Sequence, residues 1–275
     1  MRHIARRLAN MQSECDQKFM PRFAANLSMM FTEWSFLDRF AAAADAGFEA
    51  VEYLFPYDFA PEDLAHRLQD HRLEQALFNL PPGDWSAGEC GIAALAGRET
   101  EFAASVDKAL IYAEATGVKR LHVMSGLADA TDPTARNTYE KNLRIASEKL
   151  AAKTITLLIE PINSRDMPGY FLNDFDLAGE ILESLGLADM MLQFDVYHRQ
   201  IIHGDVIMGL RAMAAMIGHI QIAGVPDRHE PDSGEVNYPA VFNELDRLGY
   251  SGWVGCEYRP RAGTESGLGW FQKRN

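Results

Sequence analysis

Short apolar runs alternate with amphipathic helical patterns along the chain from Pro21 onward. Each run has the length of a strand and is rich in β-branched or large apolar residues. The segments between the runs place apolar residues three or four positions apart, as in the stretch from Phe102 to Ala113 before Gly117. This spacing is typical of a helix with one buried face. The predicted strands are residues 23–27, 50–54, 73–80, 120–124, 155–160, 191–195, 217–222 and 253–257. The predicted helices are residues 36–44, 61–69, 99–116, 134–151, 174–185, 205–214 and 241–248.

The alternation of strands and helices predicts an α/β fold with a parallel sheet, because each helix returns the chain to the edge where the next strand starts. Eight such units indicate a single closed (β/α)₈ TIM barrel rather than two small domains. An open, doubly wound sheet is the alternative fold. No G-x-G-x-x-G motif follows the first strand, so nothing favours a dinucleotide-binding domain.

Residues 1–20 differ in character from the rest of the chain. They are basic at the start but contain neither the apolar stretch nor the small-residue cleavage site of a secretory signal. We expect a short N-terminal extension that is disordered or loosely helical. The barrel domain is then expected to span residues 21–275.

Four consecutive predicted strands end in an oxygen-bearing side chain. The stretches ITLLIE, MMLQFD, IGHIQ and WVGCE end at Glu160, Asp195, Gln221 and Glu257. Consecutive strands are neighbours in a barrel, and side chains at their carboxyl ends converge on the face that carries active sites. Any one of these residues alone would be read as an exposed polar group. Together they predict a site for a hard divalent cation, Mg²⁺ or Mn²⁺, with these four side chains as ligands.

Further polar residues follow the same strand ends. His198 lies three positions after Asp195, and Arg228 and His229 lie in a long charged loop after the seventh strand. We expect these three residues to bind the substrate, since the arginine can pair with a carboxylate through two hydrogen bonds. A solvated loop is the alternative interpretation. The charge and place of the loop are also typical of a lid over an active site.

Polar and aromatic residues in the first four strand regions complete the predicted pocket. Glu52 and His122 fall inside predicted strands and are candidates for the floor of the pocket, because buried polar groups need partners. His203 is expected to have a structural role. We expect an apolar wall opposite the metal site, formed by Phe31, Trp34, Phe55, Phe78 and Trp85.

The composition narrows the range of partners. The 26 basic and 39 acidic residues give a net charge of −13, which repels nucleic-acid backbones and anionic membranes. No segment approaches the roughly 18 successive apolar residues of a membrane span. Cys15, Cys90 and Cys256 are odd in number and lack C-x-x-C spacing, so we expect neither a disulfide framework nor a zinc–thiolate site. These features predict a cytoplasmic protein that acts on a small molecule, and they leave open whether it forms a homo-oligomer.

Several longer stretches resemble the hydroxypyruvate isomerase family, a branch of the xylose-isomerase-like barrels. They are ITLLIEPINSRDMPGYFLN, QFDVYH, HIQIAGVPDRHEPDSGEVNY and TESGLGWF, and the similarity runs from about residue 21 to the end of the chain. The resemblance implies that the four strand-end residues hold the metal and that Glu160 and Glu257 also form an acid/base pair. One departure is Asp227, where the family usually has glycine, beside the expected substrate-binding Arg228.

The resemblance implies an aldose–ketose isomerase for hydroxypyruvate and tartronate semialdehyde, or for a related short oxo-acid such as a 2-oxo-tetronate. The metal would polarise the carbonyl and the adjacent hydroxyl oxygen. One glutamate would remove a proton from carbon and the other would return a proton to the neighbouring carbon. A hydride shift between the two carbons would need the same metal, and the sequence does not separate the two routes.

Three other functions are compatible with a barrel of this kind. A ketose 3-epimerase would also use a metal and paired glutamates, but a histidine at the position of Gln221 would be more typical of that group. An endonuclease-IV-like nuclease would need further histidine ligands and a basic surface. A binding protein without activity is disfavoured, because all four ligand positions are filled.

Overall fold

The computed structural model describes residues 21–272, so the expected N-terminal extension of residues 1–20 lies outside the described part of the chain, as do residues 273–275. Eight parallel strands form a closed barrel in chain order, and β8 pairs with β1. This confirms the predicted (β/α)₈ barrel and excludes the open sheet. The strands are β1 (Arg22–Asn26), β2 (Ala50–Glu52), β3 (Glu74–Asn79), β4 (Arg120–His122), β5 (Thr156–Ile159), β6 (Met190–Asp195), β7 (Ile217–Ile222) and β8 (Trp253–Cys256).

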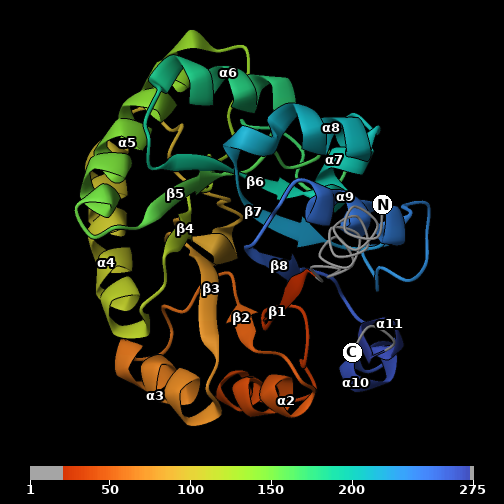
Figure 1. Cartoon of the computed structure of the whole chain (residues 1–275). Helices are drawn as coiled ribbons and strands as arrows, with labels where there is room; N and C mark the ends of the chain where they lie inside the picture. Colours follow the sequence, from red (N-terminus) through yellow and green to blue (C-terminus); the bar gives the residue numbers. More distant parts are fainter. Residues whose placement is uncertain (1–20, 273–275) are drawn as a thin grey trace, which may run out of the picture.

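The helices form a ring around the outside of the strands (Figure 1). The α-helices are α2 (Arg39–Asp45), α3 (Pro61–His71), α4 (Glu99–Thr116), α5 (Pro133–Ala151), α6 (Phe175–Leu185), α7 (Val196–Ile202), α8 (Val206–Met213), α9 (Tyr238–Arg247), α10 (Thr264–Gly267) and α11 (Gly269–Gln272). Three short 3₁₀ helices lie between them: η1 (Phe36–Asp38), η2 (Trp85–Ala87) and η3 (Ala214–Met216). None of the helices in the described part is long and apolar enough to cross a membrane.

The predicted helices form where apolar residues have helical spacing and a residue that favours a helix end follows them. In α4 the residues Phe102, Val106 and Ala109 are buried on one face, and the helix ends at Gly117, whose φ of 74° suits glycine. Helix α7 is the main element that the sequence pattern does not predict. It begins directly after β6, where the Asp195 side chain accepts a hydrogen bond from the backbone N–H of Tyr197 and caps the helix.

Strand register places the predicted ligands next to one another. Asp195 is the last residue of β6 and pairs directly with Gln221 on β7, which in turn pairs with Gly255 on β8. Glu160 and Glu257 each follow the last residue of their strands, β5 and β8. The carboxyl ends of β5 to β8 therefore carry all four side chains at one edge of the barrel.

The main hydrophobic core lies between the strands and the helical ring and includes Phe40, Phe102, Leu143, Phe194 and Leu245. The inside of the barrel is more polar. Glu52, His219 and Gln193 are at most 1% exposed there. Because buried polar groups must find partners, this interior forms the ordered support beneath the site. Cys256 is a buried free cysteine, as expected for a core residue.

Candidate active site

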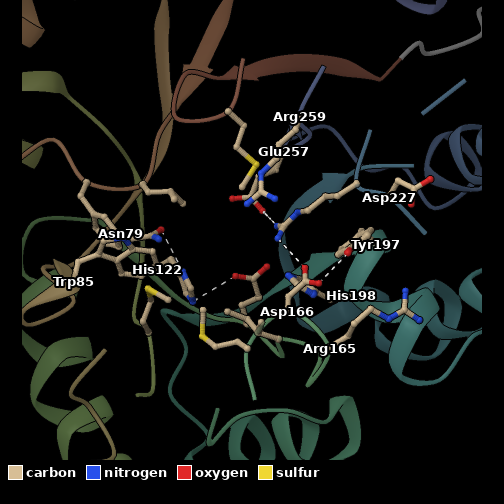
Figure 2. Close-up of a pocket in the computed structure, with 18 of the residues that line it drawn as sticks. Asn79, Trp85, His122, Arg165, Asp166, Tyr197, His198, Asp227, Glu257 and Arg259 are labelled. Carbon is tan, nitrogen blue, oxygen red and sulfur yellow. Dashed lines mark hydrogen bonds and ion pairs between the residues drawn. The ribbon is translucent and has the colours of Figure 1, made fainter. Parts of the chain in front are cut away.

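A cavity of about 480 Å³ lies at the carboxyl ends of the strands (Figure 2). Its volume is typical of sites for small molecules. Glu160, His198, Arg228 and Glu257 line it, so it contains both predicted catalytic glutamates and two predicted substrate-binding residues. It is the place in the barrel where the predicted chemistry can occur.

The carboxylates of Glu160 and Asp195 form the centre of the site. One oxygen of each and a ring nitrogen of His198 lie within 4.8 Å of one another, and all three residues are buried. Glu160 Oε1 and Asp195 Oδ2 have no hydrogen-bond partner among residues 21–272. Asp195 is not among the residues that line the cavity, so its free oxygen sits behind the cavity wall. Unpaired buried carboxylate oxygens are the donors that a hard divalent cation requires.

His198 is oriented as a hydrogen-bond donor. The backbone N–H of Asn163 donates to His198 Nδ1 at 3.3 Å, and the Asn163 side chain lies 2.6 Å from the same nitrogen. A neutral ring then carries its proton on Nε2, which lies 3.6 Å from Asp195 Oδ2. Burial, followed by the charge of Arg228, lowers the pKa of His198 well below its usual value. The residue is therefore suited to donate to a substrate oxygen rather than to bind a metal.

Gln221 is held at both ends of its amide. Its Oε1 accepts a hydrogen bond from Gln193 at 2.7 Å, and its Nε2 donates to Glu52 at 2.8 Å. Because Glu52 accepts from the amide nitrogen of Gln221, the amide oxygen of Gln221 faces Gln193. That oxygen keeps a second lone pair for a cation. Gln221 itself does not line the cavity.

Glu52 joins several strands across the barrel. It accepts a hydrogen bond from Asn26 at 3.0 Å, and its other oxygen lies 2.7 Å from His219 Nε2. Asn26 also donates to Glu257 at 3.3 Å. A Cβ atom at Gly255 would lie 2.3 Å from a Glu52 oxygen, so only glycine leaves room for this carboxylate. The position of Glu52 under the site, expected from the sequence, is thus explained by its partners.

Arg228 bridges the acidic residues on one side of the cavity. Its Nη2 lies 2.5 Å from Glu257 and 3.7 Å from Asp195, and its Nη1 lies 3.2 Å from Asp166. The guanidinium also packs over the Tyr197 ring, 4.9 Å from its centroid. Burial opposes the charge of Arg228, but the neighbouring carboxylates outweigh it and raise its pKa. The arginine is therefore a fixed cation in the site.

Burial and mutual repulsion raise the pKa values of the three carboxyl groups. Burial is the largest cause in each case, and for Glu160 the charges of Glu257 and Asp195 add to it. The pKa is raised to about 6 for Asp195 and to about 8 for Glu257, in both cases against the opposing effect of Arg228. One arginine thus leaves the cluster short of positive charge. A divalent cation would supply this charge, so the residues fit the predicted Mg²⁺ or Mn²⁺.

His122 stands on the other side of the cavity. Its Nδ1 lies 3.2 Å from Asn79 Oδ1. In the described part of the chain its Nε2 has no hydrogen-bond partner, and this nitrogen lies 3.7 Å from Glu160 Oε2. Burial lowers its pKa to about 3. The residue is part of the pocket wall, as the sequence indicated for a polar group inside β4.

One of the predicted substrate-binding residues lies outside the cavity wall. His229, expected to bind substrate, is not among the residues that line the cavity, and its Nδ1 lies 2.8 Å from the backbone oxygen of Arg259. Its neighbour Arg228 has a φ of 57°, and this turn directs the two side chains to different places. His203 lies 2.8 Å from Asp174, which caps α6, consistent with a structural role.

The expected aromatic wall is only partly correct. Phe55 and Trp85 line the cavity, with their ring centroids 5.0 Å apart. Phe31 and Phe78 are fully buried in the core, and Trp34 is exposed and does not line the cavity. Strand residues alternate between two faces, so a residue near a strand end can face the helices instead of the pocket.

The sequence interpretation missed several residues of the site. Asn79, Arg165, Asp166 and Arg259 all line the cavity. Asp166 was contained in the long motif after the fifth strand, and Arg259 follows Glu257 by two positions. Position shortly after a strand end is therefore a sequence signal that could have identified them.

Comparison with known proteins agrees with this geometry. The sequence matches the xylose isomerase-like TIM barrel family over residues 40–274. It is 59% identical to a 2-oxo-tetronate isomerase of Cupriavidus necator, over 92% of this chain and 98% of that protein. It is 45% identical to the hydroxypyruvate isomerase of Escherichia coli, again over 92% and 98% of the two chains.

A solved structure extends the comparison to three dimensions. It is named as an AP endonuclease, family 2, from Brucella melitensis, and it is 52% identical with a TM-score of 0.91 over 92% of this chain and 99% of that one. The resemblance predicted from the sequence motifs is confirmed. The chain belongs to the xylose isomerase-like TIM barrel family, and close curated relatives of it are isomerases.

Proposed function

We propose that the protein is a divalent metal-dependent isomerase that moves a carbonyl group between neighbouring carbons of a short 2-oxo acid, either hydroxypyruvate or a 2-oxo-tetronate. The observation that carries the proposal is the pair Glu160 and Glu257 in one cavity, next to the free oxygen of Asp195. The names of the curated relatives support the same substrate class.

Each residue has a role that follows from its surroundings. Glu160, Asp195, Gln221 and Glu257 would hold Mg²⁺ or Mn²⁺, which supplies a Lewis acid for the carbonyl and hydroxyl oxygens of the substrate. Arg228 offers the substrate carboxylate a buried cation. His198 donates from Nε2 to a substrate oxygen, because its Nδ1 already accepts from Asn163.

Proton transfer is assigned to the two glutamates. The raised pKa of Glu257, about 8, lets this group hold or release a proton near neutral pH. Burial also raises the pKa of Glu160. We infer that one carboxylate removes the proton from the carbon next to the carbonyl and that the other returns a proton to the neighbouring carbon.

The alternatives are less well supported. A ketose 3-epimerase would typically have histidine where Gln221 stands. The name of the Brucella relative raises the possibility of a nuclease, but a net charge of −13 opposes binding to a nucleic-acid backbone. Within the described residues, the cavity wall contains two histidines, His122 and His198, and His198 accepts at Nδ1 and so donates from Nε2. We therefore retain the isomerase.

A substrate panel with metal-stripped and metal-reloaded protein tests the proposal. Hydroxypyruvate, 2-oxo-tetronates, tagatose and fructose would each be assayed after treatment with EDTA and after addition of Mg²⁺ or Mn²⁺. We expect turnover of a short 2-oxo acid that disappears with EDTA and returns with either metal, since oxygen donors bind these ions reversibly. Full activity after verified metal removal, or turnover of the sugars alone, would contradict it.

Isotope tracing tests the route of the hydrogen. If Glu160 and Glu257 relay protons, a carboxyl group exchanges its proton with solvent between the two steps. Product formed in D₂O should then contain carbon-bound deuterium, measured by NMR at low turnover. Complete retention of the substrate hydrogen would instead support a hydride shift and leave both glutamates as metal ligands only.

A further inference from the structure

The two sides of the cavity differ in charge. Figure 2 shows Asn79, His122 and Trp85 facing Glu257 and Arg259 across the open space. The side with Glu257 contains the arginines Arg165, Arg228 and Arg259. Among the described residues, these are the cations that line the cavity, so a substrate carboxylate belongs on this side. The other end of the substrate must then approach His122 and Asn79.

His122 presents a hydrogen-bond acceptor to the cavity. Its Nδ1 faces the carbonyl oxygen of Asn79 at 3.2 Å, so a neutral ring carries its proton on Nδ1 and leaves the Nε2 lone pair free. The side chain is 1% exposed, and Nε2 has no partner within the described residues. The nearest carboxylate oxygen, on Glu160, is 3.7 Å away, beyond hydrogen-bond distance. A buried acceptor of this kind requires a donor.

A carboxylate cannot satisfy His122, because it would place a second acceptor against the Nε2 lone pair. A hydroxyl group can. The aromatic rings of Phe55 and Trp85 line the cavity together with His122. These rings offer few other hydrogen-bond acceptors to a substrate hydroxyl. The two substrate candidates differ in this group, since a 2-oxo-tetronate has a terminal hydroxymethyl group beyond the reacting carbons and hydroxypyruvate has none.

We propose that His122 Nε2 accepts a hydrogen bond from the terminal hydroxyl of a four-carbon substrate and makes the site selective for a 2-oxo-tetronate over hydroxypyruvate. This inference rests on the proposed function. Recognition of this kind involves no change in the protonation of His122. With the three-carbon acid the buried nitrogen stays unpaired, and a site built to bind a hydroxyl rejects an analogue that lacks it.

Kinetics of three variants test this role. His122→Leu removes the acceptor, whereas His122→Gln offers an amide oxygen near the place of Nε2. Met124→Leu is the matched control, because Met124 also lines the cavity but has no strong hydrogen-bonding group. We expect His122→Leu to lower the ratio of kcat/KM for 2-oxo-tetronate over hydroxypyruvate by about tenfold or more. His122→Gln should restore most of the ratio, and Met124→Leu should leave the ratio unchanged. A ratio that is unaltered in His122→Leu overturns the proposal.

Binding of unreactive acids separates this inference from the proposed function. Threonate has a hydroxyl on its fourth carbon, whereas glycerate ends at the hydroxyl of its third carbon, and their affinities can be measured by calorimetry without turnover. The wild-type protein should bind threonate about tenfold more tightly, and His122→Leu should lose this preference. Absence of turnover with both oxo-acids would reject the isomerase, yet the binding preference would still decide the role of His122. If His122→Leu does not fold, the wild-type preference and His122→Gln decide it: no preference in the wild type overturns the proposal.

Discussion

Two carboxylates that pair with arginine behave in opposite ways in this protein. Glu244 on α9 accepts two hydrogen bonds from Arg211 and two from Arg247. The hydrogen bonds from these arginines lower its pKa to about 2. Glu257 at the barrel mouth lies 2.5 Å from Arg228, but burial raises its pKa to about 8. The same kind of ion pair therefore gives opposite shifts.

The difference follows from the number of charged groups around each carboxylate. On α9 one carboxylate, 6% exposed like that of Glu257, is paired with two arginines. In the cavity Glu160, Asp195 and Glu257 share the single buried cation of Arg228. An arginine stabilises a carboxylate fully only where other acids do not compete for it. The cavity thus keeps acidic groups that are ready to bind a metal and transfer protons, whereas the outer pair is structural.

The largest expected effect is the difference in activity between variants that lack the Glu257 carboxylate and variants that lack the Glu244 carboxylate. Glu257→Gln keeps an oxygen ligand but removes the base, so we expect kcat to fall by about 10²-fold or more at any metal concentration. Glu244→Gln breaks only the ion pairs of α9, outside the cavity, and should leave kcat within about twofold of the wild type. Steady-state kinetics with increasing Mn²⁺ would measure both. Recovery of Glu257→Gln at high Mn²⁺ would remove Glu257 from proton transfer.

A smaller effect, on metal affinity, is expected when Glu52, which lies beneath the site, is replaced. In Glu52→Gln the new amide can donate as well as accept, so it no longer forces the oxygen of Gln221 toward the site. We expect Mn²⁺ affinity to fall by about 10- to 100-fold, as for other residues that orient metal ligands. Electron paramagnetic resonance of free Mn²⁺ would measure it, with Glu244→Gln as the control. An unchanged affinity in a folded Glu52→Gln protein would show that Glu52 does not orient the ligand.

The smallest effect is a pH dependence of stability in the metal-free protein. The usual glutamate pKa is 4.5, and the folded-state value of Glu257 is about 8. Between these values the folded protein holds a proton that the unfolded chain has released, so the free energy of unfolding should fall as the pH rises from 4.5 to 8. For Glu244 the folded-state pKa is about 2, so its contribution is present above pH 4.5 and is lost as the pH falls toward 2.

Urea unfolding of the wild type and the two variants would check these opposite slopes. The wild-type decline between pH 4.5 and 8 should be weaker in Glu257→Gln and unchanged in Glu244→Gln. Saturating Mn²⁺ should stabilise the protein more at pH 8 than at pH 5, because metal ligands bind in their deprotonated form. Equal slopes in all three proteins would contradict the assignment of raised pKa to Glu257.

Prediction from sequence succeeded where a repeating pattern controls geometry. The strand ends at Glu160 and Asp195 could be found because the apolar runs stop there. Apolar residues also repeat at different intervals in strands and in helices. Prediction failed for loop residues and for which side of a strand a side chain faces. Arg228 reaches the cavity while the adjacent His229 does not, and no period fixes the directions of side chains in an irregular loop.

The sequence by itself determined the barrel, the order of its strands and the position of four oxygen-bearing residues at one edge, because these follow from local periodicity and the rules for parallel sheets. Only the tertiary structure decided how the site is supported and what it can recognise. Glu52 and His219 are separated by 167 positions and meet only because the barrel closes. The unpaired nitrogen of His122 likewise depends on which neighbours lie within reach of it. Hydrogen bonds are short and directional, so contacts between distant parts of the chain are settled by packing in three dimensions.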